Sequence, residues 1–448
     1  MEICPLDDRY KEKISTLLPI FSSVSYTKYR VFIEFVYFIE LLRFLKIKKI
    51  EDTSDIVAYC KSIYEKKDFS YEYKQILEYE KITNHDVKAI EYYVKGIIRD
   101  NFIEFKPHNT MVHFGLTSQD INNVAFSLMM QDATSKVMIV EIEKLLSKLK
   151  EVSSKWIKIV MITRTHGQPA VPSTLGKELR VFIDRITKQL EELKNLTLST
   201  KFGGAVGNLN AHYCAYPEQD WLDFANSFVK SLDLDRQEYT TQIEQYDNAS
   251  KLFNTYSRIN VILKDLCVDI WLYISMNYLT QKIVKTETGS STMPHKVNPI
   301  NFENAEGNLG MANALFGFFS EKLPQSRLQR DLTDSTVIRN VGMAFGYTLV
   351  AIKSIQVGLG KISPNYNVIN QELEKNCCVI TEGYQTVMRK HGVSDAYEIM
   401  KSLTRKNEVI TRECLFEFVN ELDVSQIVKD ELLAITPENY VGTAFCEN

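Results

Sequence analysis

Hydroxyl, basic and amide side chains are grouped most densely in segment 288–299, TGSSTMPHKVNP. Its tip carries a glycine and two hydroxyl residues, Gly289, Ser290 and Ser291. Asn298 followed by Pro299 is typical of the N-cap and first residue of a helix, so a positive helix end would face the same space as Lys296. The segment therefore predicts a mobile loop that can hold an anion, with an ordinary exposed turn as the alternative.

A single histidine is enclosed by turn residues in 163–169, TRTHGQP. His166 lies between Thr165 and a Gly-Gln-Pro turn, and a histidine held in this way suits proton transfer near neutral pH. A lone histidine is more often structural, so both interpretations stay open at this point.

Three further segments each carry a weaker signal. TNHD at 83–86 places His85 before Asp86, a pair that would either orient a ligand or cap a helix. GLTSQD at 115–120 is a second polar cluster. GGAVGN at 203–208 lacks the full glycine pattern of a dinucleotide-binding loop and follows a helical run rather than a strand, so we reject that interpretation.

Guanidinium and hydroxyl groups come together in 326–339, SRLQRDLTDSTVIR. Its candidate ligands, at a predicted helix start, are Arg327, Arg330, Ser335, Thr336 and Arg339. Arginine forks, hydroxyls and helix N-terminal amides are what a phosphate monoester requires, so a phosphate site competes here with a solvated basic face. The N-terminal pair Arg9 and Tyr10 offers a further cation and phenol, although an ordinary surface position is the simpler interpretation.

Together these groups fit a β-elimination beside a carboxylate. Removing a proton next to a carboxylate needs a base and strong electrostatic stabilisation of the dianion that develops, which Lys296, Asn298 and the adjoining helix end would supply. A general acid would protonate the leaving group. The sequence shows no metal-ligand spacing and no covalent-cofactor signature, so we expect neither a cofactor nor a metal.

The elements that must position these groups are long helices. The 448 residues include only 18 glycines and 11 prolines, roughly half the usual share. Four segments contain neither residue: 20–95, 116–166, 218–288 and 393–436. Apolar residues recur with a helical spacing in 121–152, 177–202 and 246–280. We therefore predict an all-α fold with these three segments as core helices of bundle length.

Clusters of turn residues predict three helical domains. These are an N-terminal domain at 1–112, a central long-helix domain at 113–364 and a C-terminal domain at 365–448. The helix predicted at 246–280 is apolar around most of its circumference, which is more than the single stripe that a helix needs on one buried side. Burial between subunits explains this pattern best, so we expect a homo-oligomer.

Charge and composition exclude several classes of protein. With 53 Lys and Arg against 57 Asp and Glu, the net charge of −4 creates no global field toward nucleic acid or an anionic membrane. The N-terminus has no signal-like apolar stretch, and no later segment offers 18 apolar residues free of charge. The eight cysteines lack CxxC and Cys/His ligand spacings, which favours packed, reduced thiols. We predict a soluble, cytoplasmic protein without nucleic-acid or membrane partners.

The motifs also carry a family resemblance. GSSTMPHKVNP matches the GSSxMxxKxN signature of the fumarase/aspartase superfamily. Within it, the chain resembles the bacterial-type adenylosuccinate lyases through motifs in the family's order between Arg9 and Arg339: TSQDINN, TRTHGQP, MPHKVNP, FENAEGN and SRLQRDLTDST. One departure lies in QIEQYD at 242–247, where close relatives have a Pro-His pair in place of Gln245 and Tyr246.

The resemblance implies a fold, an assembly and a reaction. The fold is all-α with three domains, and the assembly is a homotetramer with a twenty-helix core and active sites that each draw on three subunits. The reaction is cleavage of adenylosuccinate to AMP and fumarate, and also of the succinylated aminoimidazole carboxamide ribotide (SAICAR to AICAR), in purine nucleotide biosynthesis.

Position by position, the resemblance also implies residue roles. Ser290 is the general base that removes the succinyl β-proton, and His166 is the general acid that protonates the departing amino nitrogen. The succinyl group is bound by Thr117, Ser118, Gln242, Lys296 and Asn298. The phosphate and ribose are bound by Arg9, Tyr10, Arg330, Ser335 and Arg339. His85 and Asp86 line the nucleotide side, and Thr165 and Ser291 complete the substrate-binding set.

Three alternative functions remain on the sequence alone. Another lyase of the superfamily, such as a carboxymuconate cycloisomerase, shares the MPHK tetrapeptide, but its substrate has no phosphate for the arginine group around Arg330. A serine hydrolase using Ser290 and His166 would lack both GxSxG and a strand before the serine. A helical scaffold without activity would explain the helices but not the loop chemistry.

Overall fold

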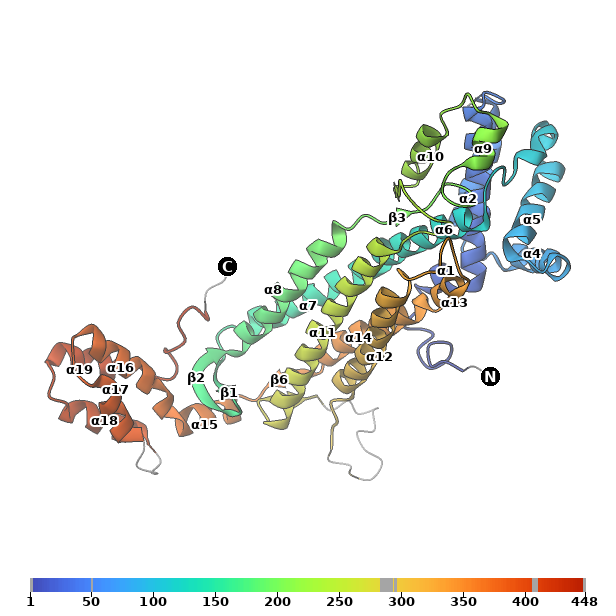
Figure 1. Ribbon diagram of the computed structural model, residues 1–448. Helices are drawn as coiled ribbons and strands as arrows, with labels where there is room; N and C mark the ends of the chain where they lie inside the picture. The colour runs from blue at the N-terminus through green and yellow to red at the C-terminus, as the bar shows by residue number, and fades with distance from the viewer. Residues whose placement is uncertain (1–2, 50, 283–292, 294–295, 405–409, 446–448) are drawn as a thin grey trace. The chain divides into compact units, whose positions relative to one another are not determined.

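Helices dominate the fold, which confirms the all-α prediction (Figure 1). The computed structural model describes residues 3–49, 51–282, 293, 296–404 and 410–445. The chain separates into two compact units: the first comprises 1–142, 189–261 and 307–353, and the second comprises 143–188, 262–306 and 354–448. The three-domain division at 112 and 364 stays a prediction.

The first unit is built on two largely buried helices, α2 (Ser23–Phe44) and α6 (Ser118–Asp132). Helix α2 begins where the Ser22 hydroxyl accepts a hydrogen bond from the Ser25 amide at 3.1 Å, which satisfies one of the free amides of the first turn. The remaining helices are α1 (Leu18–Phe21), α3 (Ser54–Glu65), α4 (Ser70–Thr83), α5 (Asp86–Asn101), α9 (Asn210–Ala215), α10 (Trp221–Lys230) and α13 (Thr333–Ile338), with 3₁₀ turns at Glu51–Thr53 and Ile103–Met111. Aromatic rings of Tyr37, Phe202, Phe224 and Phe228 fill the core beside α2 and α10.

In the described part of the chain, five long helices begin in one unit and end in the other. They are α7 (Ile139–Trp156), α8 (Leu175–Lys194), α11 (Asp247–Ser275), α12 (Ile300–Lys322) and α14 (Val341–Leu359). A π-helical turn at Ala133–Met138 joins α6 to α7, so helical structure covers the whole of the predicted 121–152. The apolar spacing therefore identified all three core helices.

Two of these helices end earlier than predicted. Helix α8 stops at Lys194 rather than 202, because the following Thr197, Ser199 and Thr200 are poor helix formers. Strand β3 (Ser199–Thr200) instead pairs in parallel with β4 (Asp235–Arg236). Helix α11 stops at Ser275, and Asn277 then adopts a left-handed backbone (φ 59°) as is common after a helix end. Strand β5 (Leu279–Gln281) then pairs antiparallel with β6 (Ile362–Pro364).

The second unit contains a β-hairpin that the sequence analysis missed. Strands β1 (Val160–Thr165) and β2 (Gln168–Thr174) are antiparallel, with a bulge between the Ile162 and Arg164 pairs. The same unit holds α15 (Tyr366–Lys375), a 3₁₀ turn at Cys377–Ile380, α16 (Thr381–Lys390), α17 (Ala396–Thr404), α18 (Arg412–Glu421) and α19 (Gln426–Leu433). Helices α16 to α19 enclose a core that includes Tyr384, Met388, Val419 and Leu432.

The apolar segment Thr333–Leu359 is the one described helical stretch with the length and hydropathy to cross a membrane. Because 72% of its apolar window is buried inside the protein, it matches the core helix of a folded domain.

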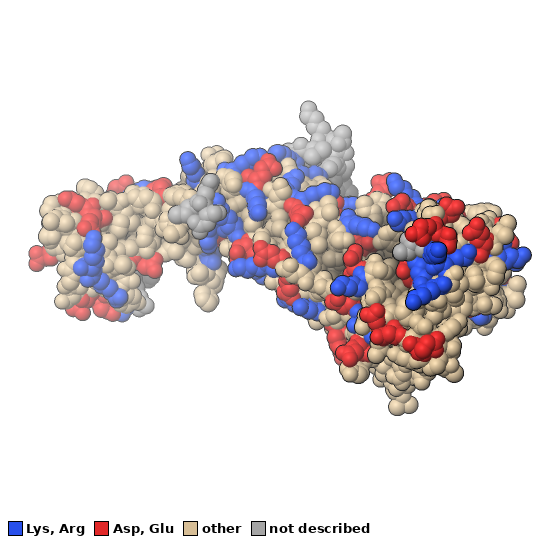
Figure 2. All heavy atoms as spheres, turned by 90° about the horizontal axis from the view of Figure 1, so that it is seen from above, with Lys and Arg blue, Asp and Glu red and all other residues tan. Residues whose placement is uncertain are grey.

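On the face shown in Figure 2, acidic and basic side chains are interspersed. Any strong anion site must therefore be built locally.

The cysteines follow the prediction only in part. The seven described cysteines are all free thiols, and Cys60, Cys267 and Cys377 are buried. Cys214 and Cys414 are exposed, so the expectation of packing is wrong for these two.

Candidate active site

The predicted site residues fall into two groups, one in each unit. The first unit holds Arg9, Tyr10, His85, Asp86, Thr117, Ser118, Gln242, Arg330, Ser335 and Arg339. The second unit holds Thr165, His166, Lys296 and Asn298, while Ser290 and Ser291 lie outside the described residues.

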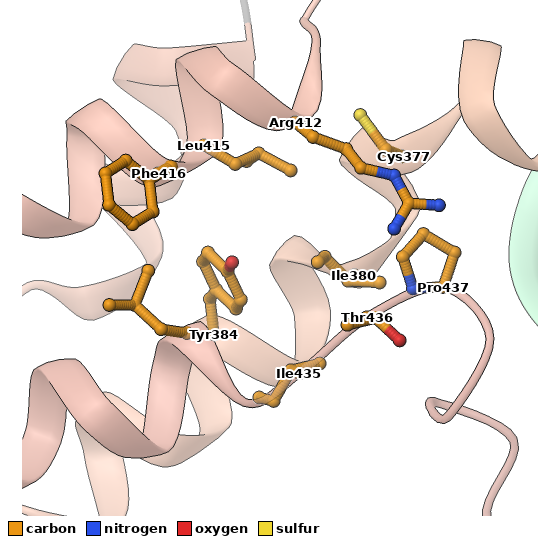
Figure 3. A pocket seen from close by; sticks show the side chains of 10 residues that line it. Cys377, Ile380, Tyr384, Arg412, Leu415, Phe416, Ile435, Thr436 and Pro437 are labelled. Carbon is orange, nitrogen blue, oxygen red and sulfur yellow. The ribbon is translucent and has the colours of Figure 1, made fainter.

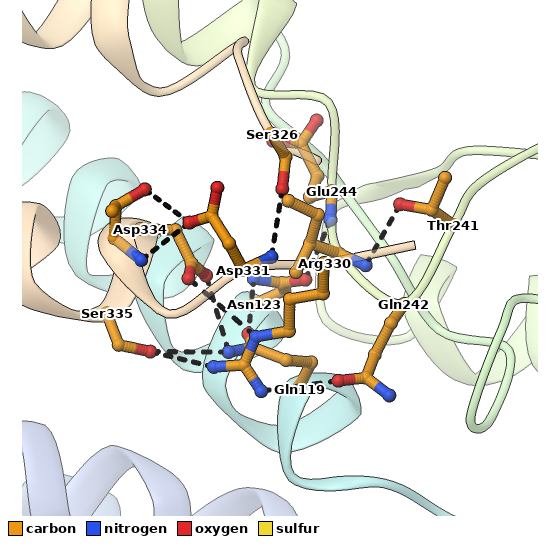
Figure 4. A network of polar contacts seen from close by, with 12 residues as sticks. Gln119, Asn123, Thr241, Gln242, Glu244, Ser326, Arg330, Asp331, Asp334 and Ser335 are labelled. Atoms are coloured by element: carbon orange, nitrogen blue, oxygen red, sulfur yellow. Dashed lines mark hydrogen bonds and ion pairs between the residues drawn. The ribbon is translucent and has the colours of Figure 1, made fainter. Parts of the chain in front are cut away.

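Arg330 is the centre of the first group (Figure 4). Its Nη2 donates to the Ser335 hydroxyl at 2.9 Å, and its Nη1 donates to Gln242 Oε1 at 3.3 Å. Its Nε lies 3.7 Å from Asp334 Oδ1, as an ion pair rather than a hydrogen bond. Gln242 is held in turn, because its Nε2 donates to the Ala205 carbonyl at 2.9 Å. The structure thus brings together three predicted residues that are up to 93 positions apart in the sequence.

The helix start predicted in 326–339 is partly correct. Helix α13 begins at Thr333, with Ser335 in its first turn and Arg339 directly after its last residue, Ile338. Asp331 stabilises this start by accepting a hydrogen bond from the Thr333 amide at 2.7 Å.

A second cluster of charge surrounds Asp86. Arg30 Nη1 lies 2.7 Å and Arg339 Nη2 lies 3.2 Å from Asp86 Oδ2. Burial alone would raise the pKa of Asp86, but the guanidinium of Arg30 outweighs this effect and the pKa lies below its ordinary value. His85 caps α5, because its Nδ1 accepts the Lys88 amide at 3.1 Å. The structure thus contains the capping role that TNHD allowed, and the ligand role stays a prediction.

Thr117 and Ser118 are placed by a buried ion pair. Asp120 Oδ1 lies 2.7 Å from Lys201 Nζ, and both side chains are 0% exposed. The same carboxylate accepts the amides of Thr117 at 2.8 Å and Gly203 at 2.8 Å. The Asp120–Lys201 pair thus joins the start of α6 to the glycine-rich loop that begins at residue 203.

The glycine-rich loop 203–208 has a structural explanation. Gly204 and Gly207 have positive φ values of 75° and 86°. A Cβ on Gly207 would lie 2.4 Å from the Thr240 carbonyl oxygen, so a side chain would not fit. The glycines therefore serve backbone packing.

Buried amides connect α6 to the Arg330 cluster, and the sequence analysis missed them. Asn123 Nδ2 donates to the Tyr246 hydroxyl at 2.9 Å and to Gln119 Oε1 at 3.1 Å. Gln119 Nε2 lies 3.4 Å from Asp334 Oδ2 and 3.5 Å from the Ser335 hydroxyl. Tyr246 is one of the two positions where the family pattern departs, and here its phenol belongs to this network. The available signal was a set of polar residues on an otherwise apolar helix.

Glu244 is a buried carboxyl. In the described part of the chain, none of its hydrogen-bond partners is a cation. It accepts hydrogen bonds from the Ser199 hydroxyl at 3.0 Å, Gln237 Nε2 at 2.5 Å and the Tyr246 amide at 2.5 Å. Burial raises the pKa of Glu244 from 4.5 to about 8. The folded protein therefore keeps this proton at pH values where the unfolded chain releases it.

We expect Glu244 to make stability pH-dependent. The folded pKa lies above the unfolded one, so the free energy of unfolding should fall as the pH rises from about 4.5 to about 8. Glu244→Gln removes the ionisation and should reduce this fall, as measured by urea unfolding at several pH values between 5 and 8.5. An identical decline in the variant and the parent protein would contradict the assignment.

His166 lies at the tip of the β1–β2 hairpin. Thr165 pairs with Gln168, which leaves a two-residue turn at His166 and Gly167 with positive φ values of 53° and 76°. Two consecutive positive φ values are typical of the tight turns that suit hairpin twist. The His166 side chain is exposed, so its imidazole is accessible to a ligand.

Lys296 and Asn298 precede α12. The helix begins at Ile300, one residue later than the predicted Asn298–Pro299 start, and the Pro299 carbonyl accepts the first helical amides. Lys296 is exposed and Asn298 is half-buried. Both residues therefore stand close to a helix N-terminus, as the sequence analysis expected.

Arg9 and Tyr10 lie on an N-terminal segment packed on α14. Cys4 Sγ lies 3.6 Å from the Tyr347 hydroxyl, and Lys353 donates to the Lys13 carbonyl. The Arg9 side chain is exposed and Tyr10 is half-buried.

The C-terminal helices enclose a pocket of about 190 Å³ (Figure 3). Its walls include Ile380, Tyr384, Leu415 and Arg412. The Arg412 guanidinium is held by Glu438 and, at 2.7 Å, by Glu374. Since carboxylates already occupy this cation, the pocket offers no evident anion site.

Comparisons with known proteins define the class of protein first. Residues 9–315 match the family model described as "Lyase". The fold is shared by a fumarate lyase from Mesorhizobium sp. BNC1 (TM-score 0.74, 16% identity, 96% of each chain). It is also shared by the 3-carboxy-cis,cis-muconate lactonizing enzyme of Pseudomonas putida (TM-score 0.74, 19% identity, 96% of this chain and 94% of that chain). The chain thus has the fumarase/aspartase-like fold.

The particular family follows from closer relatives. Residues 326–441 match the model "Adenylosuccinate lyase C-terminal". The adenylosuccinate lyase of Dictyostelium discoideum is 46% identical over 98% of this chain and 96% of its own length. That of Escherichia coli K12 is 42% identical over 99% of this chain and 96% of its own length. The chain belongs to the adenylosuccinate lyase family, and the predicted enzyme class, a carbon-nitrogen lyase, is confirmed.

Proposed function

We propose that this chain cleaves adenylosuccinate to AMP and fumarate, and also converts SAICAR to AICAR. Family membership supports a lyase reaction, and the arrangement of Arg330 with Ser335 and Gln242 supports a phosphorylated substrate. The hydrogen-bond partners of the guanidinium fork, Ser335 and Gln242, are neutral, and the carboxylate beside it, Asp334, lies 3.7 Å from Nε, which is beyond hydrogen-bond distance.

In the proposed mechanism, Ser290 removes a proton from the succinyl β-carbon. The electron pair forms the double bond of fumarate as the C–N bond breaks, and His166 gives its proton to the departing nitrogen of AMP. Lys296 and Asn298, next to the α12 N-terminus, stabilise the dianion that forms during proton removal. The exposed position of His166 at a hairpin tip supports this role, because the imidazole can reach a bound substrate.

The remaining site residues bind the substrate. The succinyl moiety is bound by Lys296 and Asn298 together with Thr117, Ser118 and Gln242. Thr165 and Ser291 also belong to the substrate-binding set. Arg9, Tyr10, Arg330, Ser335 and Arg339 bind the phosphate and ribose, and His85 and Asp86 line the nucleotide side.

The decisive experiment is the ultraviolet difference spectrum after adenylosuccinate is added, with fumarate measured independently. The proposal requires both signals in a stoichiometric ratio. Turnover of a carboxymuconate with none of adenylosuccinate would instead favour the cycloisomerase alternative, and absence of any turnover would favour a scaffold.

Arg330→Ala should raise the Michaelis constant for adenylosuccinate by roughly tenfold to over a hundredfold. Charge-assisted hydrogen bonds contribute about 1.5–3 kcal/mol each, and the variant loses one fork. The defect should be smaller for a dephosphorylated substrate analogue, and Arg330→Lys should rescue only partly because it lacks the planar fork. Equal losses for both substrates would make Arg330 structural.

We also propose a cytoplasmic homotetramer with active sites shared between subunits. The exposed apolar side chains Val261, Trp271 and Leu272 on α11 support association between subunits, because a second copy would cover them.

Shared sites predict complementation. After subunit exchange, inactive His166→Ala and Ser290→Ala proteins should regain activity, because some sites then receive both intact residues. An active monomer in sedimentation, or no recovery after demonstrated exchange, would contradict the proposal.

A further inference from the structure

The turn that carries His166 has little support from its own sheet. Strands β1 and β2 form an isolated two-stranded sheet, and such hairpins are at best marginally stable alone. The turn itself uses a left-handed backbone at a histidine, which is unfavourable relative to glycine. The orientation of the tip must therefore depend on contacts outside the hairpin.

Arg164 supplies such a contact. Arg164 is on β1, and its Nη1 donates to the carbonyl of Gly167, in the turn, at 3.3 Å. Its Nη2 donates to Glu372 Oε2 at 3.0 Å, on α15. One guanidinium thus links the carbonyl next to His166 to a neighbouring helix.

The ion pair between Arg164 and Glu372 is partly buried, which strengthens it. The Arg164 and Glu372 side chains are only 29% and 25% exposed, so water screens them less than a surface pair. Tyr278, which is 1% exposed, faces the same groups: burial and Glu372 raise the pKa of its phenol, while Arg164 lowers it. Glu372 also accepts a hydrogen bond at 3.4 Å from Nδ2 of Asn376, the residue that caps the C-terminus of α15.

We propose that the Arg164–Glu372 pair is a positioning device that holds the His166 turn for proton transfer. This inference rests on the proposed role of His166 as general acid. Proton transfer requires the donor within hydrogen-bond reach of the leaving nitrogen, and a displacement of about 1 Å can cost on the order of a hundredfold in rate. Neither Arg164 nor Glu372 needs to touch the substrate.

Glu372→Gln tests the device with a minimal change of shape, and α15 offers a matched control. Glu374 lies two residues away and forms an ion pair with Arg412 at 2.7 Å, within the C-terminal cluster. Glu372→Gln should lower kcat by about tenfold or more with KM changed less than about twofold, because ground-state binding is untouched. Glu374→Gln should leave both constants nearly unchanged, and thermal unfolding should confirm that both variants are folded.

Arg164→Lys gives an independent check. A lysine keeps the charge but cannot bridge the Gly167 carbonyl and Glu372 with one planar group, so it should show the same selective loss of kcat. Equal effects of Glu372→Gln and Glu374→Gln, or a loss confined to KM, would overturn the proposal.

A double-mutant cycle with His166→Ala separates positioning from general destabilisation. If Glu372 acts through His166, Glu372→Gln should cause no further loss of kcat once the imidazole is absent. The same fractional loss in both backgrounds would overturn the positioning role while leaving the proposed acid intact. If His166→Ala alone kept full turnover, the acid assignment itself would be wrong, and the positioning role would fall with it.

Discussion

His166→Ala is expected to lower turnover by at least about a hundredfold while leaving substrate binding largely intact. This is the scale of one general acid or base role, because the leaving nitrogen must then depart without a proton donor. The variant should also lose the alkaline limb of its pH–rate profile, on which the acid gives up its proton. An unchanged profile would exclude His166 as the acid.

The left-handed backbone at position 166 calls for a second variant. Alanine is as strained there as other side chains, whereas asparagine adopts this conformation more readily. His166→Asn should therefore keep the turn and still lose the turnover. Ser290→Ala should show a similar loss with the opposite limb missing, and retention of more than about a tenth of the activity would remove Ser290 from the base role.

Lys201→Met is expected to reduce the free energy of unfolding by about 3–5 kcal/mol, the usual cost of leaving one buried charge without its partner. Asp120 would keep its bonds to the Thr117 and Gly203 amides but would lose the ammonium at 2.7 Å. Denaturant unfolding at neutral pH measures the change. Lys188→Met is the matched control, because its partner Asp184 is 63% exposed and the pair should contribute less than about 1 kcal/mol. If both variants lost the same free energy of unfolding, burial of the Asp120–Lys201 pair would not explain its contribution to stability.

Short motifs allowed the candidate site to be predicted, because the chemistry of each motif is local to a few residues. The segment around Arg330 was identified from its own residues and Gln242 from the family resemblance, and the structure places their side chains in hydrogen-bond contact. Periodicity likewise predicted the core helices α7, α8 and α11, since a buried helix face repeats along the sequence.

The parts that were missed depend on contacts between distant residues. Nothing in the sequence pairs Lys201 with Asp120, and Arg30 lies in an apolar helix with no motif to connect it to Asp86. The hairpin at 160–174 was missed because its first strand lies in a run without glycine or proline that looked helical. The predicted C-terminal domain, 365–448, carries no usable motif, although residues 326–441 match the family model.

The Asp120–Lys201 pair also bears on the order in which the protein folds. Its two residues are 81 positions apart, so a long loop must close before they meet, and each must give up its water when they do. Such a contact gains nothing until the surrounding core excludes solvent, so we expect it to form after the rate-limiting step of folding. Loss of the pair should therefore shorten the lifetime of the native state and leave the refolding rate nearly unchanged. A residue buried beside the glycine-rich loop 203–208 would in this way set how long the protein stays folded rather than how quickly it forms.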